Sequence, residues 1–129
     1  MTPPSTAPEN FAEMIREDHL RLAVLLDLIE DELAAGKPLA GRLAQLRNMF
    51  DRYAIREEEA LTRSRPALLD SHRQGHEHMR ALLGQLSDAH DSGGDIGGLL
   101  DQVVHMFTGR LMPADAVFTA PATGPSAAP

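Results

Sequence analysis

The stretch 69–86, LDSHRQGHEHMRALLGQL, combines the periodicity of an amphipathic helix with histidines on its apolar face. His72 and His76 are four residues apart, and a helix turns by about 100° per residue, so both imidazoles fall in the middle of the apolar stripe. An imidazole at a core position needs a hydrogen-bond partner or a metal ion. The stretch therefore predicts a helix that carries polar groups into a core. The stripe consists of Leu68, Leu69, Met79, Leu83 and Leu86.

Three other segments show the same helical periodicity, and glycine or proline separates each from the next. We expect helices over about 10–35, 39–62, 66–89 and 95–112. Gly36-Lys37-Pro38 and Ser64-Arg65-Pro66 end the first two, and a Ser-Gly-Gly loop follows the third. Four helices joined by short loops predict an all-α fold, an antiparallel up-down-up-down four-helix bundle over residues 10–112.

The two ends of the chain differ in composition from this central part. Residues 1–9 hold three prolines, and we expect a flexible N-terminal arm. Residues 113–129 are rich in proline and alanine, and we expect a disordered tail.

Composition excludes several functional classes. The net charge of −7, without a cluster of Lys and Arg, argues against a nucleic-acid partner. The absence of cysteine excludes disulfides and thiolate metal sites. The N-terminus lacks the pattern of a signal peptide, and no stretch reaches the ~20 apolar residues of a membrane span. We therefore expect a cytoplasmic protein without a membrane partner.

Polar candidates also lie in the stripes of the first two helices. His19 lies beside the first stripe, Glu57 falls at the centre of the second, and Tyr53 lies on its flank, one turn before Glu57. A single core histidine is often only hydrogen bonded, and the run 57–59 of three glutamates alone fits a solvated face. Their coincidence with His72 and His76 on three helices favours a metal site. Imidazole and carboxylate without sulfur suit iron, manganese or zinc.

Three motifs give the sequence a resemblance to the hemerythrin-like (HHE cation-binding) family over about residues 10–112. IREDHLRLAVLLDLIEDEL (15–33) resembles the first helix of that family and supplies His19. YAIREEEAL (53–61) resembles the second-helix motif, with Tyr53 at the histidine position and Glu57 at the ligand position. HRQGHEHM (72–79) resembles the third helix, with both histidines in place.

The resemblance implies a ligand set for two iron ions. His72, His76 and His105 would hold one iron, His19 and Tyr53 the other, and Glu57 would bridge them. The family's fourth helix supplies a histidine followed five residues later by a second bridging carboxylate. His105 is the only histidine there, and Arg110 follows it at that spacing, so we expect the second bridge to be absent.

Two of these positions keep alternatives open. His105 projects roughly 140° from Leu100 and away from the apolar stripe, so either the fourth helix is rotated or His105 is a surface residue. Tyr53 is either a phenolate ligand of ferric iron or a core tyrosine whose hydroxyl bonds a buried Glu or His.

The resemblance implies an iron-binding protein that binds or senses O2, NO or peroxide, or handles iron. An enzymatic reaction with peroxide or NO follows by analogy alone. A mononuclear zinc or iron site is a weaker hypothesis. The hypothesis from another class is a degenerate, metal-free bundle that serves as an interaction or regulatory module for a protein partner.

Overall fold

The structure is a computed structural model that describes residues 7–119, and within this range it is helical and contains no strand. The long helices are α1 (Ala7–Ala34), α2 (Ala40–Ser64), α3 (Leu69–Asp91) and α4 (Gly97–Met106). A 3-10 turn, η1 (Pro66–Leu68), precedes α3. A π-helical turn, η2 (Phe107–Leu111), and the short helices α5 (Met112–Ala114) and α6 (Ala116–Thr119) follow α4.

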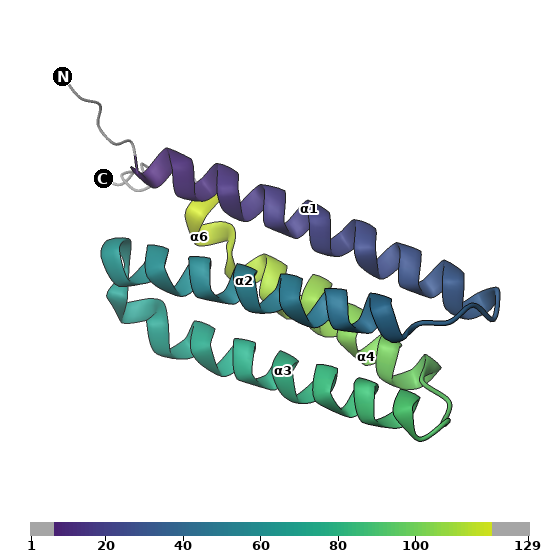
Figure 1. Cartoon of the computed structure of the whole chain (residues 1–129). Coiled ribbons are helices and arrows are strands. Elements are labelled where there is room, and N and C mark those ends of the chain that lie inside the picture. Colours follow the sequence, from purple (N-terminus) through teal and green to yellow (C-terminus); the bar gives the residue numbers. More distant parts are fainter. Residues whose placement is uncertain (1–6, 120–129) are drawn as a thin grey trace.

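The four long helices of the described part lie side by side as a bundle (Figure 1). The loops after α1 and α3 lie at one end, and the turn between α2 and α3 lies at the other (Figure 1). The loops after α1 and α3 contain Gly36 at φ 71° and Gly93 at φ 78°, a left-handed conformation that glycine adopts without steric cost.

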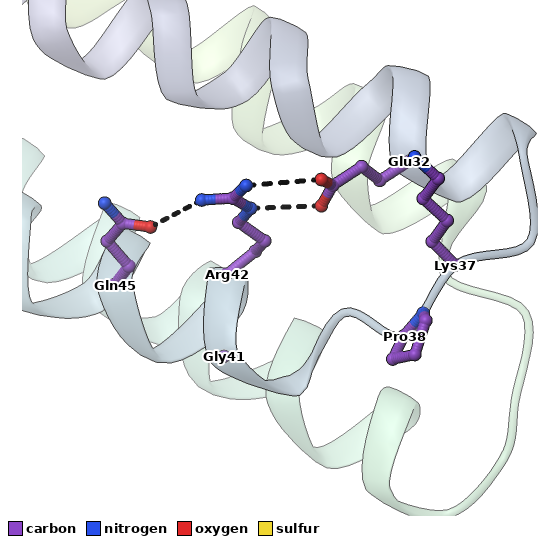
Figure 2. A pocket seen from close by; sticks show the side chains of 6 residues that line it. All are labelled: Glu32, Lys37, Pro38, Gly41, Arg42 and Gln45. Carbon is purple, nitrogen blue, oxygen red and sulfur yellow. Dashed lines mark hydrogen bonds and ion pairs between the residues drawn. The ribbon is translucent and has the colours of Figure 1, made fainter.

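The core consists of the predicted apolar stripes. Leucines from all four long helices interdigitate with Phe50 and Phe107, and these side chains are almost fully buried. Burial of this apolar surface is the main stabilising contribution to such a bundle. Arg42 adds a polar tie: its Nε and Nη2 donate to the two carboxylate oxygens of Glu32 at 3.1 and 3.3 Å, linking α2 to α1 (Figure 2).

Both ends of the bundle extend beyond the expected limits. Helix α1 begins at Ala7, inside the expected arm 1–9, while residues 1–6 lie outside the described residues. At the other end the chain stays helical past residue 112, where we expected the tail to begin; residues 120–129 again lie outside the description.

Pro113 does not end the fourth helical segment, which runs through α4, η2 and α5; the π-helical turn η2 ends at Leu111, two residues before the proline. Proline lacks an N–H group and clashes with the preceding turn of an α-helix. The wider turn η2 accommodates this break, and helical bonding then resumes, with the Asp115 backbone N–H donating to the Leu111 carbonyl at 3.2 Å. Pro113 predicts the end of a helix. In the structure the chain instead passes through a widened turn and stays helical.

None of the helices in residues 7–119 has the length and apolar character that a membrane crossing requires.

We predict that Ile29→Ala and Ile55→Ala have very different effects on stability. Ile29 is 0% exposed and Ile55 is 55% exposed. Truncation at Ile29 leaves a cavity and should lower the free energy of unfolding by about 2–5 kcal/mol, whereas the surface substitution should change it by less than about 0.5 kcal/mol. Urea unfolding followed by circular dichroism measures both, and equal losses would contradict this core.

Candidate metal centre

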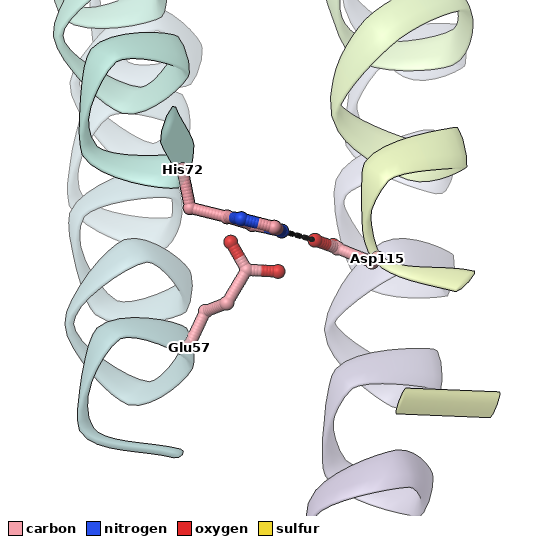
Figure 3. A group of neighbouring side chains, drawn as sticks. All are labelled: Glu57, His72 and Asp115. Atoms are coloured by element: carbon pink, nitrogen blue, oxygen red, sulfur yellow. Dashed lines mark ion pairs between the residues drawn. The ribbon is translucent and has the colours of Figure 1, made fainter. Parts of the chain in front are cut away.

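His72 presents one ring nitrogen toward the interior of the bundle. Its Nδ1 lies 3.0 Å from the carbonyl oxygen of Leu68, the last residue of η1, and donates to it. Its Nε2 lies 3.5 Å from Oδ1 of Asp115 (Figure 3). A histidine whose Nδ1–H is held by a backbone carbonyl has its Nε2 lone pair directed for metal binding. Interaction with the Asp115 carboxylate raises the pKa of His72, against the opposing effect of burial.

His76 is fully buried between two consecutive glutamates. Its Nε2 lies 2.6 Å from Oε1 of Glu57, and its Nδ1 lies 2.7 Å from Oε2 of Glu58. Burial lowers the pKa of His76, although the hydrogen bond to Glu58 opposes this shift. The neutral ring therefore donates from Nδ1 to the Glu58 carboxylate and keeps Nε2 facing Glu57. Glu58 belongs to the run interpreted as a solvated face, and its contact with His76 was not predicted.

Asp115 is the carboxylate that the sequence analysis missed. It is 1% exposed, and its Oδ2 lies 2.6 Å from the Tyr53 hydroxyl, which donates to it, and 2.6 Å from Nε2 of His19. Burial alone would raise the pKa of Asp115, but the hydrogen bond from His19 and then the interaction with His72 lower it well below its ordinary value. Asp115 is therefore ionised and connects α1, α2 and α3 to the end of the fourth helix.

Glu57 has the opposite protonation behaviour. Burial, reinforced by the negative charge of Asp115, raises the pKa of Glu57 from 4.5 to about 11. The pair of carboxyl groups therefore carries one negative charge, because Asp115 is ionised and Glu57 is protonated. Tyr53 is also neutral, because burial and then the nearby Glu57 and Asp115 raise the pKa of its hydroxyl.

Unpaired oxygens mark the place where a cation fits. Among the described residues, the buried side-chain oxygens without a hydrogen-bond partner are Oε2 of Glu57, Oδ1 of Asp115 and Oδ2 of Asp18. Glu57, His72 and Asp115 each offer a ligand atom, and these atoms all lie within 4.8 Å of one another (Figure 3). A buried carboxylate oxygen without a partner is costly, and a metal ion removes that cost. The nitrogen and oxygen donors fit a first-row transition metal.

The structure brings five of the six sequence-predicted residues together: His19, Tyr53, Glu57, His72 and His76. The rings of His19 and His76 each lie 5.7 Å from the Tyr53 ring. His105 is not brought to this cluster. It is exposed, and its Nδ1 lies 3.2 Å from the Asp101 carbonyl oxygen on the outer side of α4. The fourth helix is not rotated to turn His105 toward the core. Of the two alternatives, His105 is therefore a surface residue.

The expectation that a second carboxylate is absent was wrong. Asp115 follows Arg110 by five residues, so the family spacing on the fourth helix is met by Arg110 and Asp115, with arginine at the histidine position. The Arg110 side chain points to the surface, where Nη1 lies 3.4 Å from Nδ1 of His78. A sequence signal for Asp115 existed, because it continues the stripe of Phe107 and Leu111 at intervals of four.

Gly75, between the two histidines of α3, permits this end of the fourth helix to approach. A Cβ atom at position 75 would lie 3.1 Å from Cδ2 of Leu111. Such a distance is tighter than an ordinary van der Waals contact, so a side chain here would press against η2. The glycine therefore helps to bring Asp115 within reach of His72.

Comparison with known protein families gave one match. The family model described as the hemerythrin HHE cation binding domain matches residues 10–112. The chain belongs to the hemerythrin HHE cation-binding family. Within this hemerythrin-like domain the match ends three residues before Asp115. Searches of curated proteins and of solved structures gave no match.

We predict that Glu57→Gln flattens the pH dependence of stability in protein kept free of metal by a chelator. The folded protein retains the Glu57 proton up to a pKa of about 11, whereas the unfolded chain loses it near 4.5. The contribution of Glu57 to the free energy of unfolding is therefore fully present below pH 4.5 and decreases as the pH rises toward about 11.

Urea unfolding between about pH 5 and pH 9 measures this slope. Glu59→Gln, at an exposed position of the same helix, is the control and should keep the slope of the unsubstituted protein. An unchanged slope in Glu57→Gln would contradict the protonated state of Glu57.

Proposed function

We propose that this protein is a hemerythrin-like non-haem iron protein, built as an antiparallel up-down-up-down bundle, that binds or senses O2, NO or peroxide. The observation that carries the proposal is a pair of buried carboxyl oxygens without a hydrogen-bond partner, on Glu57 and Asp115, whose carboxyl groups lie beside Nε2 of His72. Family membership supports a cation as the occupant.

The donors are numerous enough for two iron ions. His72 and His76 would hold one ion, and His19 and Tyr53 the other. Asp115 has one oxygen near each group, Oδ2 at His19 and Oδ1 at His72, and Oε1 of Glu57 lies at His76, so both carboxyl groups would help to hold the metal. Bound iron would supply an open coordination position and a redox-active centre for a small ligand.

The surrounding protein would exclude water and hold the donors in place. Phe50 and Phe107 pack against the imidazoles of His76 and His19, with ring centroids 5.9 and 5.7 Å apart. Such an apolar lining favours a small, uncharged ligand such as O2 or NO and strengthens electrostatic interactions inside the site. Arg110 replaces one imidazole of the family pattern, which would leave the iron at His72 and His76 with one more open position.

Tyr53 has a defined role in either protonation state. As a neutral phenol it donates to Asp115 and fixes the direction of that carboxylate. A metal ion beside it would lower the pKa of the hydroxyl and convert it to a phenolate ligand. The two roles differ in the spectrum, because only a tyrosine bound to ferric iron as a phenolate adds a phenolate-to-iron charge-transfer band in the visible range.

The second candidate is a metal-free bundle that acts as an interaction module. It is favoured by the hydrogen bonds themselves, because His19, His72 and His76 each already have a carboxylate within 3.5 Å. The arginine at position 110 favours it as well. Metal analysis separates this candidate from the first.

We predict about two iron ions per chain when the apoprotein is reconstituted with ferrous iron, as in di-iron carboxylate bundles. His72→Ala and Asp115→Asn should lose most of this binding, while His105→Ala, at an exposed position, should retain it. Tyr53→Phe should remove a visible phenolate band if Tyr53 is a ligand. Metal analysis and absorption spectroscopy measure these outcomes.

A measured content of about one ion per chain would support a mononuclear site instead of a di-iron site. A protein that stays colourless and metal-free, yet helical, would support the interaction module instead.

We predict that Glu58→Gln weakens metal binding by roughly 10- to 100-fold, as do other losses of a carboxylate that orients a ligand histidine. Glu58 accepts from Nδ1 of His76 at 2.7 Å, and the amide would no longer supply the negative charge that makes Nε2 a strong donor. Glu59→Gln is the matched control. Isothermal titration with Zn2+ measures both affinities, and equal values would show that Glu58 does not act through His76.

A further inference from the structure

The outward face of α1 carries an apolar patch that nothing in the described chain covers. Leu20 is 65% exposed and Val24, one turn later, is 58% exposed. Beside them lies a groove of about 370 Å³ between α1 and α2, lined among others by Leu25, Leu28 and Met49. Two large apolar side chains next to an apolar groove form a contiguous patch, and such patches mark interaction sites.

The groove is open in the structure, and hydrogen bonds fix the position of one of the side chains that line it. Arg42, which lines it on the α2 side, is held by both carboxylate oxygens of Glu32 and by Oε1 of Gln45 at 3.3 Å (Figure 2). The guanidinium is therefore already paired, and apart from Arg21 and Gln45 the other residues that line the groove are apolar. A partner must supply an apolar ridge that fits between α1 and α2.

We propose that this ridge is the same face of a second copy, so that the protein forms a two-fold symmetric dimer through antiparallel α1 helices. In a two-fold interface the surface must be complementary to itself, with residue i opposite j and j opposite i. Placing Val24 on the axis puts Leu20 opposite Leu28 of the second copy. The protruding Leu20 of each chain then enters the groove of the other.

The charges on this face fit the antiparallel register. With Val24 on the axis, Arg21 lies opposite Asp27 of the second copy, and the symmetry creates this opposite-charge pair twice. Arg21 and Asp27 are both exposed, one on each side of Val24. Glu17 would lie opposite Asp31, but these two exposed residues are at the rim, where solvent and salt screen their repulsion. A parallel arrangement would instead place Arg21 opposite Arg21 and Asp27 opposite Asp27.

Sedimentation equilibrium over a range of concentrations tests the dimer with the full chain. The unsubstituted protein should approach twice the mass of one chain. Val24→Glu should weaken the dimer at least about tenfold, because it places two like charges on the axis of an apolar interface. Ile55→Glu, at an equally exposed apolar residue of α2, is the matched control and should leave the dimer unchanged. Circular dichroism checks that each variant stays helical.

A charge exchange tests the register. Asp27→Arg alone should weaken the dimer, because it faces Arg21 of the second copy, and the double variant Arg21→Asp/Asp27→Arg should restore it. A monomer at every concentration, or a dimer insensitive to Val24→Glu, would overturn the proposal. Equal weakening by Ile55→Glu, or no restoration in the double variant, would overturn it as well.

Discussion

The carboxylate of Asp115 is the interaction on which the polar half of this bundle depends. It is 1% exposed and lies within 3.5 Å of donors from three other helices: His19 on α1, Tyr53 on α2 and His72 on α3. A buried charge is tolerated only when it is paired and hydrogen bonded, and removing one partner of such a group typically costs about 3–5 kcal/mol. The end of the fourth helix must therefore stay docked for the other polar residues to remain satisfied.

The interior of the bundle consists of an apolar part and a polar part. The apolar part, built from stripes such as Leu22, Leu46, Leu83 and Leu100, supplies the stability. The polar part, toward the turn between α2 and α3, places imidazoles, a phenol and carboxyl groups where apolar side chains would pack more favourably. A protein that retains such a cluster carries a local cost, and the proposed cation at Glu57 and Asp115 would offset it.

The outer face of α1 carries exposed apolar side chains that the fold of a single chain does not bury. Its exposed Leu20 and Val24 lie on the side of the helix opposite the core, so burial of the core does not involve them. A dimer through this face would leave the metal centre in the interior of each chain. The proposed metal site and the proposed dimer surface therefore use different parts of the bundle.

The sequence by itself determined the four helices, most of their limits and five of the polar residues that meet in the cluster. It did so because apolar periodicity identifies the inner face of each helix, and His19, Tyr53, Glu57, His72 and His76 lie on or beside those faces. The family resemblance followed from the same residues, and the family match confirms it.

Only the tertiary structure decided the roles of Asp115, Glu58 and His105. Pro113 predicts a helix end, but the chain continues through the π-helical turn η2, and Leu111 of this turn lies close to Gly75 of α3. Glu58 lies in a run of acidic residues whose contacts depend on how α2 and α3 pack. His105 satisfied the search for a fourth-helix histidine, but the core packs on the other side of α4. Periodicity states which face of a helix is apolar, whereas the partner of each polar atom is set by contacts between residues far apart in the chain.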